Sequence, residues 1–172
     1  MTFVRGFLVT AAIAAAVPLA PALGAGAKVL ATNGAWEAYA HGEKAGKACY
    51  MASAPKSSDG AAKDRGTPYL SVTHRPADKS VDVVGVVAGY TYKKGSMVEV
   101  DVDGAKFKMF TNGGGAWMSD AAGDRALVAA MARGNRLTVR GTPAKGAATV
   151  DTYALAGFSA SYAEIGKACG VK

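Results

Sequence analysis

The chain has 172 residues, of which 50% are hydrophobic and 22 are glycine, and its formal net charge is +7 at pH 7. This length provides for one domain with a substantial core, and the glycines and scattered valines favour a turn-rich β protein over a helical bundle. The lysines are dispersed and do not alternate with aromatic residues, which argues against the basic groove of a nucleic-acid-binding protein. We expect the charge to keep the domain soluble, with weak contact to polyanions such as lipopolysaccharide, membrane headgroups or glycans as a secondary property.

Residues 1–27 have the three regions of a cleaved secretory signal peptide. A basic residue near the start precedes residues 7–17, an uncharged apolar stretch that is too short to span a membrane. Small residues follow, and cleavage after Ala25 or after Ala27 fits the sequence equally well. No later stretch approaches the ~18 apolar residues of a transmembrane helix. We therefore predict an exported single domain over residues 28–172.

Short segments of alternating polar and apolar residues predict an antiparallel β fold. In chain order, strands are expected at residues 36–39, 47–53, 68–75, 81–90, 97–102, 105–110, 136–140 and 146–155. Residues 28–34 are expected to form a leader, residues 55–68 a polar loop and residues 112–115 a flexible loop. The valine-rich strand 81–90 is predicted to be covered on two sides, with a β-bulge at Gly85. Seven or more short strands separated by turns indicate a β-sandwich.

The hairpin of residues 97–110 is the strongest local signal, because Asp103-Gly104 suits a two-residue turn with positive φ at both positions. Counting back from the turn pairs Val102 with Ala105, Asp101 with Lys106, Val100 with Phe107 and Glu99 with Lys108. Every apolar residue then faces an apolar one, and each acidic residue faces a lysine.

Three acidic residues of this hairpin, Glu99, Asp101 and Asp103, suggest a cation site at first sight. The facing lysines neutralise two of them, and the spacing lacks the glycine and the distal glutamate of a calcium loop. We therefore expect no metal site here.

Two short helices complete the predicted fold. Ser119 or Asp120 is expected to cap a helix that runs through Arg133 and ends at Gly134. Its apolar face consists of Leu127, Val128 and Met131. Residues 159–169 are expected to form a short C-terminal helix.

Cys49 and Cys169 are the only cysteines, and they lie near the two ends of the exported chain. In an oxidising compartment such a pair is expected to form a disulfide. A redox-active pair would have the close spacing of a Cys-x-x-Cys motif, whereas these two are far apart in the sequence. We predict a structural bond that stabilises the domain by roughly 4–5 kcal/mol on the chain-entropy model.

No residue pattern indicates catalysis or a cofactor. His41 and His74 are the only histidines and lack a metal-binding spacing, and His74 is expected to be an ordinary residue at the end of a strand. Ser71, His74 and Asp151 are residue types of a hydrolase triad, but no serine lies in a nucleophile-elbow pattern. The large aromatic residues are expected in the core or at its rim. They are Trp36, Trp117, Tyr69, Tyr90, Tyr92 and Tyr153.

Short segments between residues 36 and 169 form a recognisable series. They are Cys49-Tyr50, Arg65-Gly66-Thr67-Pro68-Tyr69-Leu70, Val72-Thr73-His74-Arg75-Pro76, Ala88-Gly89-Tyr90 with Tyr92-Lys93, Phe107 to Thr111, Ala116-Trp117, Leu127-Val128 with Met131 and Gly134, Gly141-Thr142, Asp151-Thr152-Tyr153-Ala154-Leu155 with Gly157-Phe158-Ser159, and Ala168-Cys169. In order and spacing the chain resembles the invasion-associated locus B family of exported alphaproteobacterial proteins. It departs from the family at Gly113-Gly114-Gly115, where a more polar, acidic turn is expected.

The resemblance implies an immunoglobulin-like β-sandwich that is periplasmic, outer-membrane-associated or secreted. It implies no established enzymatic activity and no catalytic residues. We therefore expect a non-enzymatic binding protein, linked to host-cell invasion or envelope maintenance, whose partner is a protein or another envelope component. The alternatives are a periplasmic enzyme or enzyme inhibitor of unknown substrate, and an envelope stress or structural protein without a specific ligand.

Overall fold

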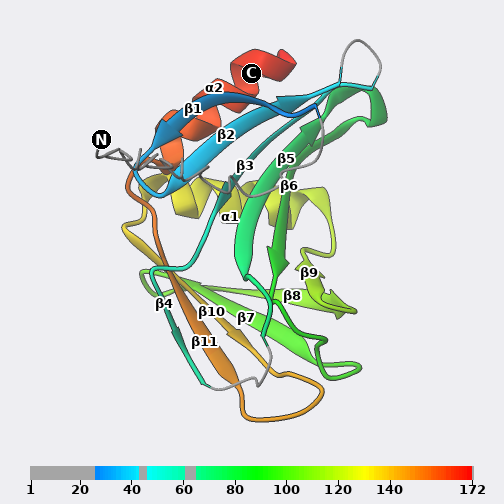
Figure 1. Cartoon of the computed structure of the whole chain (residues 1–172), viewed down its shortest axis with the longest axis vertical. Coiled ribbons are helices and arrows are strands. Elements are labelled where there is room, and N and C mark those ends of the chain that lie inside the picture. Colours follow the sequence, from blue (N-terminus) through cyan, green and yellow to red (C-terminus); the bar gives the residue numbers. More distant parts are fainter. Residues whose placement is uncertain (1–25, 43–45, 61–64, 172) are drawn as a thin grey trace, which may run out of the picture.

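The structure is a computed structural model that describes residues 26–42, 46–60 and 65–171 (Figure 1). The predicted signal peptide lies almost wholly outside the described residues. The same holds for part of the turn after His41 and part of the loop before Arg65.

The strands of the described chain form one continuous antiparallel sheet of eleven strands. In chain order they are β1 (Lys28–Asn33), β2 (Trp36–His41), β3 (Ala48–Ser53), β4 (Ser57–Asp59), β5 (Tyr69–Arg75), β6 (Ser80–Val87), β7 (Met97–Val102), β8 (Ala105–Asn112), β9 (Gly115–Trp117), β10 (Arg136–Gly141) and β11 (Thr149–Ala154). Across the sheet the order is β1-β2-β3-β5-β6-β9-β8-β7-β10-β11-β4. Figure 1 shows β1, β2, β3, β5 and β6 in the upper part of the molecule and β4, β7, β8, β10 and β11 in the lower part.

Two α-helices pack on the sheet, α1 (Ala121–Arg133) on β6 and α2 (Phe158–Cys169) on β1, β2, β3 and β5. The start of α1 is as predicted, because the Asp120 side chain accepts a hydrogen bond of 2.8 Å from the Gly123 amide. Its predicted apolar face is buried, and Gly134 ends the helix. Both expected helices are thus confirmed. A short 3₁₀ turn (Pro76–Asp78) links β5 and β6.

The buried side chains of both parts of the sheet and of both helices form a single core. Trp36 of β2 lies at its centre, where its ring meets Phe158 of α2 edge-on at 5.0 Å and its indole N–H donates to the Ala154 carbonyl. Strands contribute every second residue, as in Leu70 and Val72 of β5. The expected fold class, a mainly antiparallel β fold with one internal and one C-terminal helix, is confirmed.

The predicted hairpin is confirmed residue by residue. β7 and β8 pair Val102 with Ala105 and continue in the expected register to Glu99 with Lys108 and on to Met97 with Phe110. Asp103 and Gly104 have φ of 48° and 99°, as this turn requires.

Three predictions about strands were wrong. Residues 28–33 form the edge strand β1 rather than a leader, and the polar loop 55–68 contains the second edge strand, β4. The expected flexible loop of residues 112–115 is a tight turn, because β8 extends to Asn112 and β9 begins at Gly115. β4 and β9 have three residues each, too few for alternation to be visible in a sequence, and β1 is an edge strand whose residues are at most half-buried.

Gly85 is not a bulge, and β6 is not covered evenly on two sides. Gly85 pairs in register with Ser71 and with Trp117, and the irregularity lies between Thr73 and Arg75. Glycine suits position 85 because a Cβ there would come 3.3 Å from both the Trp117 indole nitrogen and the Ser71 hydroxyl. The glycine therefore makes room for a tryptophan ring on the sheet surface.

The predicted disulfide is confirmed. Cys49 of β3 is bonded to Cys169, the last residue of α2, with a Cα–Cα distance of 5.9 Å. The bond fastens α2 to the strands that it covers. Among the helices of the described residues, none has the length and apolar character to cross a membrane.

Candidate functional site

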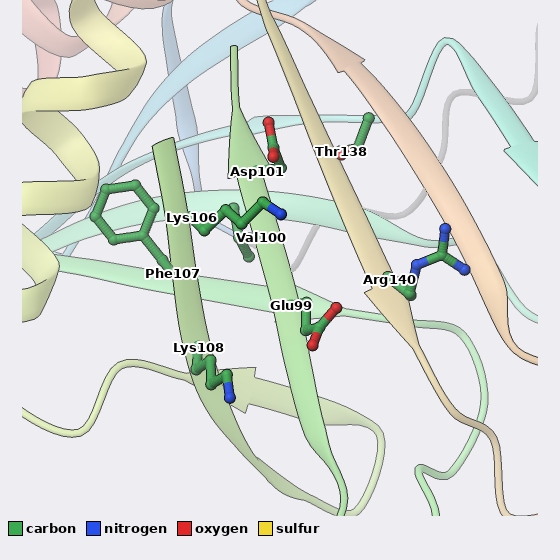
Figure 2. Close-up of a pocket in the computed structure, with 8 residues that line it drawn as sticks. All are labelled: Glu99, Val100, Asp101, Lys106, Phe107, Lys108, Thr138 and Arg140. Carbon is green, nitrogen blue, oxygen red and sulfur yellow. The ribbon is translucent and has the colours of Figure 1, made fainter. Parts of the chain in front are cut away.

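A shallow groove of about 540 Å³ crosses β8, β7 and β10 on the face of the sheet away from the core (Figure 2). Its lining residues are Glu99, Val100, Asp101, Lys106, Phe107, Lys108, Thr138 and Arg140. Val100 and Phe107 belong to the core side of the sheet, and Figure 2 shows the Phe107 ring pointing away from the charged side chains. The other six side chains form the solvent side of the groove.

The groove carries two rows of polar side chains across three strands. Glu99 of β7 lies between Lys108 of β8 and Arg140 of β10. In the next row, Asp101 lies between Lys106 and Thr138 of the same two strands. Within the described ranges, no carboxylate oxygen of this groove lies within 4.0 Å of a cationic nitrogen. The groove therefore presents charges of both signs that are available to a partner.

The acidic triplet of the hairpin is not gathered at one point. Asp103 lies in the turn and accepts a 2.6 Å hydrogen bond from the Asn135 amide, while Asp101 accepts one of 2.8 Å from the Gly104 amide. No group of three or more potential metal-ligating side chains occurs in the described part of the chain.

An apolar patch continues the groove. Met97 of β7, Phe110 of β8 and Trp117 of β9 pair in one row across the strands. Met97 is 45% exposed and Phe110 is 41% exposed. The Phe110 and Trp117 rings have centroids 6.1 Å apart. The Trp117 ring lies over Gly115, where any Cβ would overlap it. We call this row the apolar patch. The pairing of β7, β8 and β9 fixes the positions of its three residues.

The groove and the apolar patch share one surface, called here the outer face. Side chains two residues apart on a strand lie on the same side of the sheet, so Met97 and Glu99 are neighbours on β7, as Phe110 and Lys108 are on β8. The hairpin register predicted the charges of this surface correctly. The apolar patch was not predicted, because residues 115–117 gave no strand signal and hence no partner strand for Phe110.

A buried ion pair joins Arg65 and Asp151. The guanidinium donates two hydrogen bonds to the carboxylate, at 2.9 and 2.5 Å, and Nε donates to the Ala88 carbonyl at 2.7 Å. The Ser58 hydroxyl donates to the same carboxylate at 2.6 Å, and the guanidinium lies 5.1 Å from the centroid of the Tyr90 ring. The hydrogen bonds to Asp151 raise the pKa of Arg65. Together with the Ala88 carbonyl, this pair connects three of the segments that carry the family resemblance. Because the guanidinium and the carboxylate are both held by several hydrogen bonds to protein atoms, we assign the pair a structural role.

Trp36, Tyr90, Tyr92 and Tyr153 occupy the core and its rim, as expected, whereas Trp117 lies on the outer face. Trp36, Tyr92 and Tyr153 are buried, Tyr90 and Trp117 are half-buried, and the exposed one is Tyr69. The hydroxyl groups of Tyr92 and Tyr153 have no hydrogen-bond partner among the described protein atoms. Burial raises the pKa of both phenols, so both stay neutral at physiological pH.

His74 lies near the end of β5, but it is fully buried rather than an ordinary strand-end residue. Its Nδ1 accepts a 3.1 Å hydrogen bond from the Asp82 amide, and the Asp82 carboxylate is 3.8 Å away. The Tyr162 hydroxyl of α2 donates to that carboxylate at 2.5 Å, and its ring meets the imidazole edge-on. Burial lowers the pKa of His74.

The three residue types of a hydrolase triad have separate partners in the structure. The Ser71 hydroxyl donates to the Gly85 carbonyl, His74 contacts Asp82, and Asp151 contacts Arg65. His41 lies exposed at the end of β2.

Comparisons with known proteins agree with the residue-level resemblance. The sequence profile of the family described as Invasion associated locus B (IalB) protein matches residues 36–166. The crystal structure of invasion associated protein B from Bartonella henselae has a similar fold, with a TM-score of 0.56 and 21% sequence identity. The superposition covers 78% of this chain and 94% of that chain. No curated protein sequence gave a significant match.

Proposed function

The chain belongs to the invasion-associated locus B family, and on that premise we propose that it is an exported, non-enzymatic binding protein of the cell envelope. Its binding surface is the outer face. The partner is a protein or another envelope component, and the family description extends the proposal to host-cell invasion or envelope maintenance.

The observation that carries the proposal is the apolar patch beside the charged groove. Soluble domains rarely expose neighbouring large apolar side chains, and such patches with polar rims mark interaction sites. Here Met97 and Phe110 are both more than one third exposed, and Trp117 adjoins them. Four charged side chains with exposed positions, Lys106, Lys108, Glu99 and Arg140, surround the groove that the patch continues.

Export is supported by the disulfide between Cys49 and Cys169, since such bonds persist in oxidising compartments. The proposed signal peptide ends just before β1. Cleavage after Ala25 or after Ala27 would leave β1 intact, because the strand begins at Lys28. We place the protein in the periplasm, at the outer membrane or outside the cell.

A non-enzymatic role is supported by the interior polar clusters. Arg65 and Asp151 form an ion pair with each other, and His74 accepts a hydrogen bond from the Asp82 backbone amide inside the core. Catalytic groups need access to a substrate, whereas these groups are enclosed.

Binding to isolated envelopes of the producing bacterium tests this proposal. The oxidised chain of residues 28–172 is expected to co-sediment with the envelopes, and a K106E/K108E variant on the outer face is expected to lose most of that binding. A K167E variant, which reverses an exposed charge on α2, is the control for charge reversal elsewhere on the surface and is expected to bind like the wild type. Equal loss in both variants, or full binding by K106E/K108E, would contradict the proposal.

A further inference from the structure

Cations outnumber carboxylates near the apolar patch. Lys108 lies two residues from Phe110 on the same face of β8, and Lys93 and Lys94 lie in the turn that leads into Met97. Lys106 and Arg140 continue the positive charge along the groove. The carboxylates among these groups are those of Glu99 and Asp101, so cations predominate around the patch.

The patch lies at a corner of the molecule where two turns meet. The turn of residues 93–96 is closed by a 2.9 Å hydrogen bond from the Ser96 amide to the Lys93 carbonyl. The Thr111 hydroxyl donates to the Ser96 carbonyl at 2.7 Å, and the Tyr92 amide donates to the Gly113 carbonyl at 2.9 Å. These bonds fix the two turns side by side. Figure 1 shows the ends of β8 and β9 at the right of the lower part of the molecule.

A corner with exposed apolar and aromatic side chains and a basic rim suits the surface of an anionic bilayer. Tryptophan and phenylalanine side chains insert at the headgroup level, and lysines nearby are attracted to anionic lipids. The Trp117 ring already rests on Gly115 and Gly85, so insertion would require little ordering of its side chain.

We propose that the partner of the outer face is an anionic lipid bilayer, with Met97, Phe110 and Trp117 inserted at the headgroup level and lysines 93, 94 and 108 contacting lipid phosphates. The inference rests on the proposed function and specifies its ligand. The protein then lies on the membrane surface and does not span it.

Vesicle binding with tryptophan emission as the readout tests this proposal. The oxidised chain of residues 28–172 is mixed with vesicles of phosphatidylethanolamine and phosphatidylglycerol, and separately with vesicles of phosphatidylcholine. Trp117 is half-buried and is expected to shift its emission to shorter wavelength on the anionic vesicles. Trp36 is fully buried and hydrogen-bonded to Ala154, so its emission should stay constant, and a W117F variant should lose the shift. The apparent affinity should fall by about tenfold when the salt concentration rises from about 50 to about 500 mM.

Matched variants distinguish binding through the apolar patch from nonspecific adsorption of the protein to vesicles. An M97S/F110S variant and a K93S/K94S variant are each expected to bind anionic vesicles about tenfold more weakly than wild type. V29S removes the most exposed large apolar side chain among the described residues, at the far edge of the sheet, and K167S removes a lysine of α2. Both controls are expected to bind like wild type. Thermal unfolding of each variant verifies that it is folded.

Three results would overturn the inference in different ways. If the anionic vesicles neither sediment the protein nor shift Trp117, while envelopes still bind through the outer face, the lipid assignment fails and the proposed function stands. If V29S weakens vesicle binding as much as M97S/F110S, the lipid contact is not made by the apolar patch. If envelopes and vesicles both fail to bind, the proposed function fails together with this inference.

Discussion

His74 shows how one buried side chain connects three elements of the fold. It lies on β5, accepts a hydrogen bond from the Asp82 amide of β6, and contacts the Tyr162 ring of α2. Because Nδ1 is the acceptor, the neutral imidazole carries its proton on Nε2, and that nitrogen has no partner among the described protein atoms. Burial of the ring favours the neutral imidazole, and the Asp82 carboxylate at 3.8 Å opposes this effect in part.

This environment predicts a specific dependence of stability on pH. Burial lowers the folded-state pKa of His74 below its usual value of about 6.5, so the unfolded chain takes up a proton first as the pH falls. The free energy of unfolding should therefore decrease below about pH 6.5, down to the lowered folded-state pKa. Asp124 acts in the opposite direction, because burial raises its pKa and its protonation on acidification favours the folded state.

Urea unfolding of wild type and an H74Q variant between about pH 5 and pH 7 checks this dependence. The difference between the two curves isolates His74, since Asp82, Tyr162 and Asp124 are present in both proteins. We expect the wild type to lose more stability on acidification than H74Q does. Parallel curves across this range would show that His74 does not titrate as its burial requires.

At the scale of elements, long strands with a defined turn were predictable and short ones were not. The register of β7 and β8 followed from Asp103-Gly104 alone, because that turn fixes which residues face each other. β4 and β9 are three residues each, too short to show alternation, and β1 is an edge strand whose residues are at most half-buried. β4 pairs with β11, which is distant in the sequence, and β9 pairs with the distant β6 as well as with β8.

The same limit applies to the candidate site. The charges of the outer face were visible in the hairpin register, whereas the apolar patch requires β9 beside β8. The Arg65–Asp151 pair joins residues 86 positions apart, and nothing local to either residue indicates the partner. The disulfide was predictable over a longer separation because the chain has only two cysteines.

Gly115 offers a test of how β9 supports the outer face. A Cβ at this position would overlap the Trp117 ring, so G115A should displace the indole from its place beside Phe110. We expect a loss of about 1–3 kcal/mol in the free energy of unfolding, together with a change in tryptophan emission. G46A is the matched control, because a Cβ at Gly46 meets nothing within 4 Å. Equal stability of G115A and wild type, with unchanged emission, would show that Trp117 does not lie over this glycine.

At the scale of the whole molecule, the two edges of the sheet are protected against pairing with other chains. β1 begins with Lys28 and has an irregular register between Val29 and Ala31, and β4 is short and polar. The helices cover the inner side of β1, β2, β3, β5 and β6. These features leave the outer face open to a partner, with Met97 and Phe110 exposed beside its charged side chains.

The disulfide between Cys49 and Cys169 holds α2 on the sheet. A C49S/C169S variant should lose about 4 kcal/mol of the free energy of unfolding, because a bond that closes so long a loop restricts the unfolded chain strongly. Urea unfolding of the oxidised wild type and the variant, both without reductant, measures the loss. Since α2 packs on the inner side of the sheet, the folded variant should keep its binding through the outer face. A change below about 1 kcal/mol would contradict the stabilising role of the bond.

Site-specific photo-crosslinking in the producing bacterium tests most directly whether the outer face meets the partner. A photoreactive phenylalanine analogue is placed at Phe110 in one strain and at Val29 in another, since both side chains are exposed and lie in distant strands. We predict that illumination yields envelope adducts from position 110 and none above background from position 29. Adducts from position 29 with none from position 110 would contradict the assignment of the outer face as the binding surface.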